Sequence, residues 1–279
     1  MTIEQVRWGS RGSPAERVAV SATDPWNLIR VMPAEGNGHF AERENRHRPE
    51  TGTRWRFVLG EVDVIHRERV VIFANGECHP ARDVHRWLEG RWVLCADGGT
   101  LHALALGLHP DVVIGDLDSL PEDVRDRLDA EGTQFLQYPR DKDYTDLELA
   151  LQSAMGRGAK DILLLGLLGG RLDQTLANVL LLARPEWDAA RLWFAHGSER
   201  AHLLRGGESL TLHGHPGDIV SLIPLTPTVT GVTTQGLRWP LREATLYFGH
   251  TRTISNELVG EEAAVKVAEG RIVVTISHG

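Results

Sequence analysis

The stretch Asp111-Val112-Val113-Ile114-Gly115-Asp116-Leu117-Asp118 carries the signal around which the rest of the chain is organised. An apolar, strand-like run leads through a glycine to two carboxylates one residue apart. Because side chains alternate along a strand, Asp116 and Asp118 point the same way while the strand geometry lasts. Such a pair favours a hard divalent cation such as Mg²⁺, which takes oxygen ligands and is usually shared with substrate phosphates. For the pair alone, turn chemistry is an equally good explanation.

The residues after this pair predict the start of a helix. Ser119-Leu120-Pro121-Glu122 fits the capping box, in which a hydroxyl and a glutamate satisfy the first free backbone N–H groups of a helix. We therefore assign Ser119 to helix capping, which leaves Asp116 unexplained by capping.

Outward from this stretch, apolar runs and helical segments alternate at least five times. Strands are predicted at 70–74, 92–96, 111–114, 134–137, 161–165 and 191–195, with helices that include 80–88, 100–106 and 120–130. These strands are continuously apolar, which indicates a parallel sheet covered on both faces. We predict an α/β fold in which a parallel-sheet catalytic domain at 66–199 precedes an antiparallel β-sandwich domain.

The two ends of the chain have different patterns. From 200 to 279, short β-type runs are separated by glycine, proline and charged turns, and no helical period survives, which predicts the β-sandwich. Residues 1–65 are polar and charged without a sustained period, and we predict a poorly ordered extension without chemistry.

Composition excludes several classes of protein. The chain has 279 residues, 42% hydrophobic and 24% charged, with a formal net charge of −8, which disfavours a nucleic-acid binder. Its two cysteines, Cys78 and Cys95, indicate neither a disulfide scaffold nor a zinc site. No apolar run approaches the ~18 residues of a membrane helix. The first thirty residues also lack a signal-peptide pattern, so we expect no membrane partner and a cytoplasmic location.

Acidic or glycine-rich loops follow four of the predicted strands. They are Asp97-Gly98-Gly99, Asp116 with Asp118, Asp141 with Asp143, and Gly169-Gly170-Arg171. In a parallel sheet these strand ends share one edge, where open α/β folds bind their ligands. Carboxylates gathered there would repel one another unless cations neutralised them, which indicates Mg²⁺ ringed by aspartates. The glycines allow close approach to phosphate oxygens, and Arg171 can grip a phosphate bidentately.

Taken together, these motifs resemble those of the thiamine pyrophosphokinase family. The matching stretches are Ala96-Asp97-Gly98-Gly99, Gly115-Asp116-Leu117-Asp118-Ser119, Asp141-Lys142-Asp143-Tyr144-Thr145-Asp146 and Gly169-Gly170-Arg171-Leu172-Asp173-Gln174. In the C-terminal part, Gly236-Leu237-Arg238-Trp239-Pro240-Leu241 and Thr253-Ile254-Ser255-Asn256-Glu257 resemble motifs of that family's second domain. The resemblance covers roughly 70 to 279, and Gln174 stands where the family often has histidine.

The resemblance implies a Mg²⁺-dependent enzyme that transfers pyrophosphate from ATP to the hydroxyl of thiamine, giving thiamine pyrophosphate and AMP. It also implies a homodimer with the active site at the subunit interface. By motif position, the metal ligands are Asp97, Asp116, Asp118 and Asp146. The ATP-binding residues are Asp97, Gly98, Asp143, Thr145 and Arg171, and the catalytic residues are Asp116, Asp118, Asp146 and Asp173. The thiamine-binding residues are Gln174, Trp239, Ser255 and Asn256.

Trp239 has two interpretations. Its ring offers a flat face to the cationic thiazolium or to the pyrimidine ring, but most of the eight tryptophans are expected to pack in cores. Its place in a Gly-Leu-Arg-Trp-Pro turn favours the binding role. Ser255 and Asn256 are candidate partners for the pyrimidine, and by themselves they read as a turn at a strand end.

Three other functions fit parts of the sequence. A pyrophosphokinase acting on a hydroxymethyl pterin would use the same acidic edge, but it would not require the C-terminal domain with Trp239. A metal-dependent phosphohydrolase would need the acidic edge and no acceptor alcohol. A non-catalytic thiamine-binding module would not need the carboxylates.

Overall fold

The computed structural model describes residues 17–19, 30–32 and 68–278, and the chain divides into two units, Met1–His66 and Arg67–Gly279. In the first unit, β1 (Arg17–Ala19) and β2 (Arg30–Met32) pair antiparallel. The rest of the predicted extension lies outside the described residues. Among the helices that are described, none is long and apolar enough to cross a membrane.

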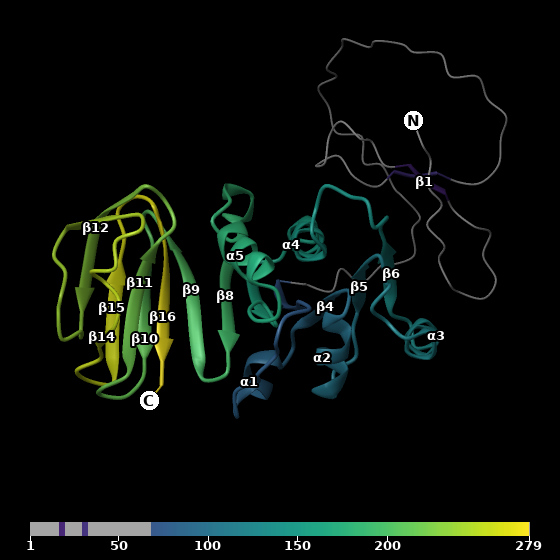
Figure 1. The fold of residues 1–279 in the computed structure, drawn as a ribbon, viewed down its shortest axis with the longest axis horizontal. Coiled ribbons are helices and arrows are strands. Elements are labelled where there is room, and N and C mark those ends of the chain that lie inside the picture. Colours follow the sequence, from purple (N-terminus) through teal and green to yellow (C-terminus); the bar gives the residue numbers. More distant parts are fainter. Residues whose placement is uncertain (1–16, 20–29, 33–67, 279) are drawn as a thin grey trace, which may run out of the picture. The chain divides into compact units, whose positions relative to one another are not determined.

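Six parallel strands form the centre of the second unit (Figure 1). In sheet order they are β8 (Arg191–His196), β7 (Asp161–Leu165), β3 (Arg69–Phe73), β4 (Trp92–Ala96), β5 (Val112–Gly115) and β6 (Gln134–Gln137). Both β4 and β5 are buried along their whole length. The predicted parallel sheet of continuously apolar strands is therefore confirmed.

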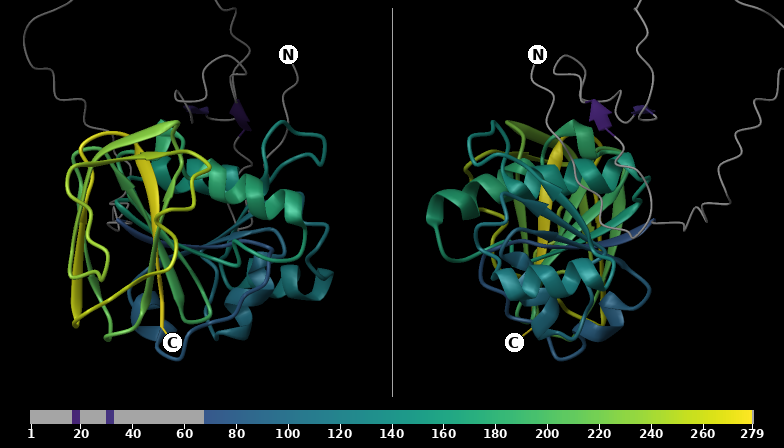
Figure 2. Two further views of the ribbon diagram at one scale, coloured as in Figure 1. Left: turned by 60° about the vertical axis from the view of Figure 1, so that its left-hand side comes forward. Right: turned by 90° about the vertical axis from the view of Figure 1, so that its right-hand side faces the viewer.

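Helices cover both faces of this sheet (Figure 2). They are α1 (Val84–Leu88), α2 (Gly99–Ala105), α3 (Glu122–Ala130), α4 (Asp146–Gly156), α5 (Leu172–Leu181) and the short 3₁₀ helix η1 (Pro185–Trp187). Alternate strand residues face opposite sides. Val70 and Ile72 of β3 pack in one core with α4. Val71 and Phe73 of the same strand pack in a second core with α1 and α2. The predicted α/β architecture is confirmed.

The predicted helix cap at Ser119 is wrong, whereas Thr145 caps α4. The Thr145 hydroxyl accepts a hydrogen bond from Glu148 N at 3.2 Å and caps α4. Ser119 does not cap α3, because that helix begins only at Glu122 with Pro121 in the capping position. Because a proline disfavours helical geometry in the residue before it, Pro121 keeps Leu120 out of the helix, so α3 cannot begin directly after Ser119. The Ser119 hydroxyl instead donates to Asp118 at 3.2 Å.

The helix α5 differs from the other helices because none of its residues is buried. Leu172, Leu176 and Leu180 are 73%, 56% and 53% exposed. Their spacing of four residues places them on one face of the helix. We call these three residues the apolar stripe of α5.

Beyond β8 the same sheet continues with antiparallel strands. These are β9 (Glu199–Arg205), β16 (Arg271–Ser277), β11 (Ile219–Pro224) and the short edge strand β14 (Asn256–Glu257). A second sheet consists of β10 (Ser209–His213), β15 (Glu262–Lys266), β12 (Thr228–Gln235) and β13 (Ala244–Tyr247). Val220 and Val274 from the first sheet share a core with Val232 and Val265 from the second. The predicted β-sandwich is confirmed.

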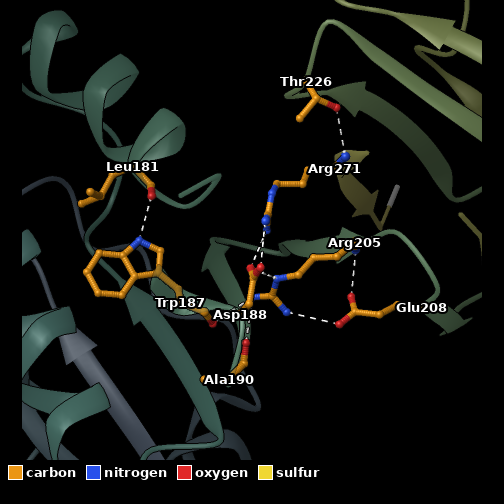
Figure 3. Close-up of polar contacts among 8 residues, drawn as sticks. All are labelled: Leu181, Trp187, Asp188, Ala190, Arg205, Glu208, Thr226 and Arg271. Atoms are coloured by element: carbon orange, nitrogen blue, oxygen red, sulfur yellow. Dashed lines mark hydrogen bonds and ion pairs between the residues drawn. The ribbon is translucent and has the colours of Figure 1, made fainter. Parts of the chain in front are cut away.

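The predicted division near residue 200 falls at the hairpin of β8 and β9. It separates the parallel strands from the antiparallel strands of one continuous sheet, not two sheets. An ion-pair network ties the two halves together (Figure 3). Asp188 accepts two hydrogen bonds from Arg271, at 2.5 and 2.8 Å, and lies 3.0 Å from Arg205 Nε. Arg205 also donates to the backbone carbonyls of Trp187 and Ala190. The parallel and antiparallel halves are thus joined by covalent, β-sheet and ionic contacts.

Candidate active site

Three predicted carboxylates, Asp97, Asp116 and Asp118, follow the carboxyl ends of β4 and β5, which are neighbours in the sheet. One oxygen each of Asp97, Asp116 and Asp118 lies within 4.8 Å of those of the other two. Asp146, in the first turn of α4, approaches Asp97 across Gly115. We call Asp97, Asp116, Asp118 and Asp146 the acidic cluster. The parallel topology brings Asp97, Asp116 and Asp118 together as predicted, and Asp146, which the family resemblance implied, reaches them from α4.

Backbone geometry at the acidic cluster depends on residues that tolerate close approach. A Cβ on Gly115 would lie 3.0 Å from Asp97 Cβ and 3.2 Å from Asp146 Cγ, so a side chain there would push the two aspartates apart. Asp97 and Leu117 have φ angles of 45° and 65°, which residues other than glycine rarely adopt. Strain of this kind persists where the surroundings enforce it, and it gathers at functional sites.

Asp97 is the residue whose surroundings fit a bound cation. Its side chain belongs to a residue only 6% exposed, and within residues 68–278 its Oδ1 has no hydrogen-bond partner. A buried carboxylate oxygen left in this state is unfavourable unless a cation compensates it. The neighbouring oxygens of Asp116 and Asp118 complete a ligand set of the type that Mg²⁺ prefers. The residues present therefore fit a hard divalent cation.

Lys142 supplies a positive charge to the acidic cluster. Its Nζ lies 3.0 Å from Asp146 Oδ1, and its side chain is only 13% exposed. Burial raises the pKa of Asp146, and the charges of Asp97 and Asp116 raise it further, whereas Lys142 lowers it. Lys142 belongs to the quoted motif that also contains Asp146, and in the structure the two side chains form an ion pair.

The rest of the loop between β6 and α4 is open to solvent. Asp141, Asp143 and Thr145 are exposed. The Arg140 guanidinium lies 3.8 Å from the carboxylate of Asp118. Because the Thr145 hydroxyl already caps α4, an additional ATP contact would have to share this oxygen or use the backbone. The ATP-binding roles of Asp143 and Thr145 stay predictions.

The glycine-rich loop after β7 ends in an exposed ion pair. Arg171 donates to Asp173 from Nε at 3.1 Å and from Nη2 at 2.5 Å, and the two side chains are 71% and 65% exposed. The hydrogen bond from Arg171 lowers the pKa of Asp173. Gln174 is exposed beside them on the first turn of α5. All three side chains are accessible to a ligand at this edge.

Sequence reasoning missed two residues that support these loops. A Cβ on Gly98 would lie 2.3 Å from Asn75 Oδ1, so the Asn75 amide packs directly against the Asp97-Gly98 turn. Glu77 Oε1 accepts a hydrogen bond from Gly170 N at 3.3 Å. Both residues follow the strand predicted at 70–74 in the same parallel sheet, and this position was the signal that could have identified them.

Trp239 lies on the antiparallel half and is 54% exposed, so it is not a core residue. Asn256 is 8% exposed; its Oδ1 accepts from Trp239 N at 3.0 Å and its Nδ2 donates to Trp239 O at 2.8 Å. The Arg238 guanidinium lies 4.9 Å from the centroid of the Trp239 ring. Exposed Ser255 has a φ of 60° and donates its backbone N–H to Ser221 Oγ at 3.0 Å. Two side-chain hydrogen bonds thus hold the backbone of Trp239, while its ring stays largely accessible to solvent.

Comparisons with known proteins agree with this arrangement. Residues 84–194 match the model of the thiamin pyrophosphokinase catalytic domain, and residues 209–272 match that of the thiamin pyrophosphokinase vitamin B1 binding domain. Thiamine pyrophosphokinase 1 of Arabidopsis thaliana is 30% identical over 215 residues, which cover 68% of this chain and 79% of the relative. The thiamine pyrophosphokinase of Bacillus subtilis is 29% identical over 177 residues, which cover 63% of this chain and 83% of the relative.

Solved structures of the same family share the fold. The crystal structure of the Bacillus subtilis thiamine pyrophosphokinase matches with a TM-score of 0.67 at 26% identity, covering 75% of this chain and 99% of that one. The thiamin pyrophosphokinase of Geobacillus thermodenitrificans matches with a TM-score of 0.64 at 28% identity, covering 75% and 97%. Both domain models match in the expected order, on the two halves of the fold that hold the acidic cluster and Trp239. The chain belongs to the thiamine pyrophosphokinase family.

Proposed function

We propose that this chain transfers pyrophosphate from ATP to the hydroxyl of thiamine, giving thiamine pyrophosphate and AMP. The observation that carries the proposal is the acidic cluster with the partnerless oxygen of buried Asp97, in a member of this family. It lies at the carboxyl edge of a parallel sheet, where open α/β folds bind ligands. The exposed Trp239, within the region that matches the vitamin B1 binding domain, supports thiamine as the acceptor.

We assign Mg²⁺ to the acidic cluster, with Asp97, Asp116 and Asp118 as ligands and Asp146 beside them. When bound, the ion neutralises charge on the phosphates of ATP. The contribution of the chain is to hold the carboxylates close together on a rigid edge, so that little reorganisation is needed during the reaction. One carboxylate of this edge accepts the proton of the thiamine hydroxyl.

Cationic side chains and glycines at the same edge fit the triphosphate. Gly98, Gly169 and Gly170 let phosphate oxygens approach the backbone. Arg171 exchanges its contact with Asp173 for a phosphate, which costs little because exposed ion pairs contribute little to stability. Asp173, once released, and Gln174 then orient the attacking hydroxyl. Asp143 and Thr145 complete the proposed ATP contacts.

The thiamine side of the site uses an aromatic face. A cationic thiazolium over the Trp239 ring is stabilised by the ring quadrupole. Asn256 already uses its amide to hold the Trp239 backbone, so it acts by positioning Trp239. Ser255 presents an exposed hydroxyl to the pyrimidine.

Distances within the sheet support a site built from two copies of the chain. Asn256, which holds Trp239, lies on β14, and Asp97 follows β4; the two strands are separated by six others in the sheet order. Seven inter-strand steps of ~4.8 Å amount to roughly 30 Å, which is too far for one thiamine bound to ATP to bridge. We therefore propose a homodimer in which Trp239 of one copy faces the acidic cluster of the other.

The apolar stripe of α5 supports this dimer. Leu172, Leu176 and Leu180 start directly after Arg171, so the exposed apolar surface begins at the proposed phosphate site. A second copy that covers the stripe would also exclude water from this edge, which strengthens electrostatic interactions with the phosphates. The same contact would thus serve assembly and chemistry.

The test is incubation of the protein with thiamine, ATP and Mg²⁺, followed by separation of the products. We expect equal amounts of AMP and thiamine pyrophosphate, with neither formed when thiamine is omitted or EDTA is added. AMP production with a hydroxymethyl pterin and not with thiamine would instead identify the pterin enzyme. Release of inorganic phosphate from phosphoesters without any acceptor would identify a phosphohydrolase.

A further inference from the structure

We propose that Glu77, His79 and His196 form a binding site for a divalent transition metal such as Zn²⁺, separate from the acidic cluster. One ligand atom of each residue lies within 4.8 Å of the other two. Two imidazoles and one carboxylate are a ligand set of zinc sites that keep an open coordination position. The inference goes beyond the proposed reaction, which assigns no role to these three side chains.

The geometry of the three side chains suits such an ion. His79 Nε2 lies 3.3 Å from Glu77 Oε2, and two ligands of a tetrahedral ion with bonds of 2.0–2.1 Å are also ~3.4 Å apart. The rings of His79 and His196 meet edge to face with centroids 4.9 Å apart. The Glu77 and His79 side chains are 58% and 60% exposed, so rotations can bring all three ligands onto an ion arriving from solvent.

Backbone hydrogen bonds assemble this cluster from segments that are distant in sequence. The residues after β3 lie against the end of β7, because Gly76 N donates to Gly166 O at 2.8 Å and Glu77 N to Leu168 O at 2.7 Å. At the end of β8, Gly197 N donates to His79 O at 2.7 Å. The backbone positions of the ligands are therefore fixed before an ion binds, which lowers the ordering cost of binding.

Glu77 also has the supporting contact that metal ligands usually have. Its Oε1 accepts from Gly170 N, which leaves Oε2 for the ion. Contacts of this kind orient a ligand and tune its affinity. An ion at this site would fix Glu77 and, through Glu77, the glycine-rich loop that precedes Arg171.

A second histidine cluster provides a contrast. His215, Asp218 and His278 also lie within 4.8 Å of one another. However, His278 Nδ1 is 2.6 Å from Asp218 and its Nε2 is 2.6 Å from the Arg200 guanidinium, so both ring nitrogens are already occupied. Among the described residues, the His196 ring has no hydrogen bond that an ion would have to replace. The acidic cluster offers only oxygen ligands, which suit hard ions.

The experiment is a titration of the full-length, tag-free protein with Co²⁺ in excess Mg²⁺, monitored by the visible absorption of coordinated Co²⁺. We expect a single Co²⁺ per chain that Zn²⁺ displaces. The His79→Gln and His196→Gln proteins should bind at least roughly 10-fold more weakly, because loss of even a supporting partner of a ligand costs ~10–100-fold. Since this readout needs neither ATP nor thiamine, its outcome is independent of the proposed reaction.

Matched controls locate the site. His85→Gln, at an exposed histidine of α1, and His215→Gln should keep the wild-type affinity. Glu77→Gln keeps an acceptor for Gly170 N while it removes the charged ligand, and it should also weaken binding with an unchanged circular dichroism spectrum. The proposal is overturned by a wild-type protein without a submillimolar Co²⁺ band, by a band that persists in His79→Gln or His196→Gln, or by its loss in His215→Gln.

Discussion

The acidic cluster and the Trp239 face are built by opposite physical means. Asp97 is 6% exposed and sits among like charges, whereas Trp239 is 54% exposed and is held by the amide of Asn256. Charge neutralisation gains from a rigid and partly dehydrated environment. Recognition of a flat cationic ring gains from an accessible aromatic face. The comparison predicts that substitutions in the two regions will have different effects on turnover, binding and stability.

The largest effect is expected at the acidic cluster. Asp118→Asn removes a charged oxygen ligand and should lower kcat by roughly 10²–10³-fold, the scale observed when one electrostatic contact to a transition state is lost. Because the Asp118 side chain is 54% exposed, the melting temperature should stay the same or rise as carboxylate repulsion falls. Steady-state kinetics and thermal unfolding measure both quantities. Glu122→Gln, at an exposed carboxylate at the start of α3, serves as the control and should leave kcat unchanged.

A histidine where the parallel and antiparallel halves meet should make the free energy of unfolding depend on pH. His202 on β9 stacks on Trp193 of β8 with ring centroids 5.7 Å apart. Burial, together with Arg191 and Arg200, lowers the pKa of His202 from 6.5 to about 4. Because the unfolded chain binds this proton more readily, stability is complete above pH 6.5 and is lost as the pH falls toward 4, by up to roughly 3 kcal/mol.

His202→Phe keeps an aromatic ring on Trp193 and removes the titrating group. Urea unfolding between pH 4 and 7 should therefore show a smaller loss of stability in the variant than in the wild type. Parallel pH profiles for the two proteins would show that His202 does not contribute.

A smaller effect is expected where Asn256 holds Trp239. Asn256→Ala leaves Trp239 N and O without their side-chain partners and should cost ~1–3 kcal/mol of stability. The KM for thiamine should rise while the KM for ATP stays constant, because the aromatic face loses its orientation. Asn178→Ala, which removes one amide contact to Leu167 O, is a matched control for stability without a selective change of KM for thiamine.

The smallest energetic effect belongs to Trp239 itself. Trp239→Ala should raise the KM for thiamine by roughly 2- to 30-fold, corresponding to a cation–π contact of ~0.5–2 kcal/mol, with little change in melting temperature. Trp187 is only 1% exposed, so Trp187→Ala should instead cost ~3–5 kcal/mol of stability. If Trp239→Ala melts as low as Trp187→Ala and shifts neither KM selectively, the binding role of Trp239 is wrong.

The sequence predicted the acidic edge because parallel topology leaves little freedom. Once the strands ending before Asp97 and Asp116 are recognised as neighbours in a parallel sheet, their following residues must share an edge. Asp146 was instead assigned from the motif that resembles the family, and it lies at the start of α4 next to Thr145. Local pattern and global fold agree at these positions, and such agreement is typical of sequences that specify one structure.

Other features depended on contacts that local patterns do not encode. The continuation of the parallel sheet into β9 results from pairing across a hairpin, and Pro121 overrode the capping pattern at Ser119. The exposure of the apolar stripe of α5 could not be predicted from periodicity, because a helical period is the same whether the partner is a sheet, a second chain or water. The clamp of Asn256 on Trp239 joins residues 17 positions apart, which requires the folded sandwich.

In the proposed dimer, the acidic cluster of one copy and Trp239 of the other form a single site. This arrangement can be tested by mixing Asp118→Asn protein with Trp239→Ala protein under conditions of subunit exchange and measuring activity at a thiamine concentration well below the KM of the Trp239→Ala protein. In a two-fold dimer with shared sites, random pairing makes about a quarter of all sites fully intact, so the mixture should exceed the average of the two separate proteins. If exchange is confirmed by mass spectrometry and the activity only equals that average, Trp239 and the acidic cluster do not share a site across two subunits.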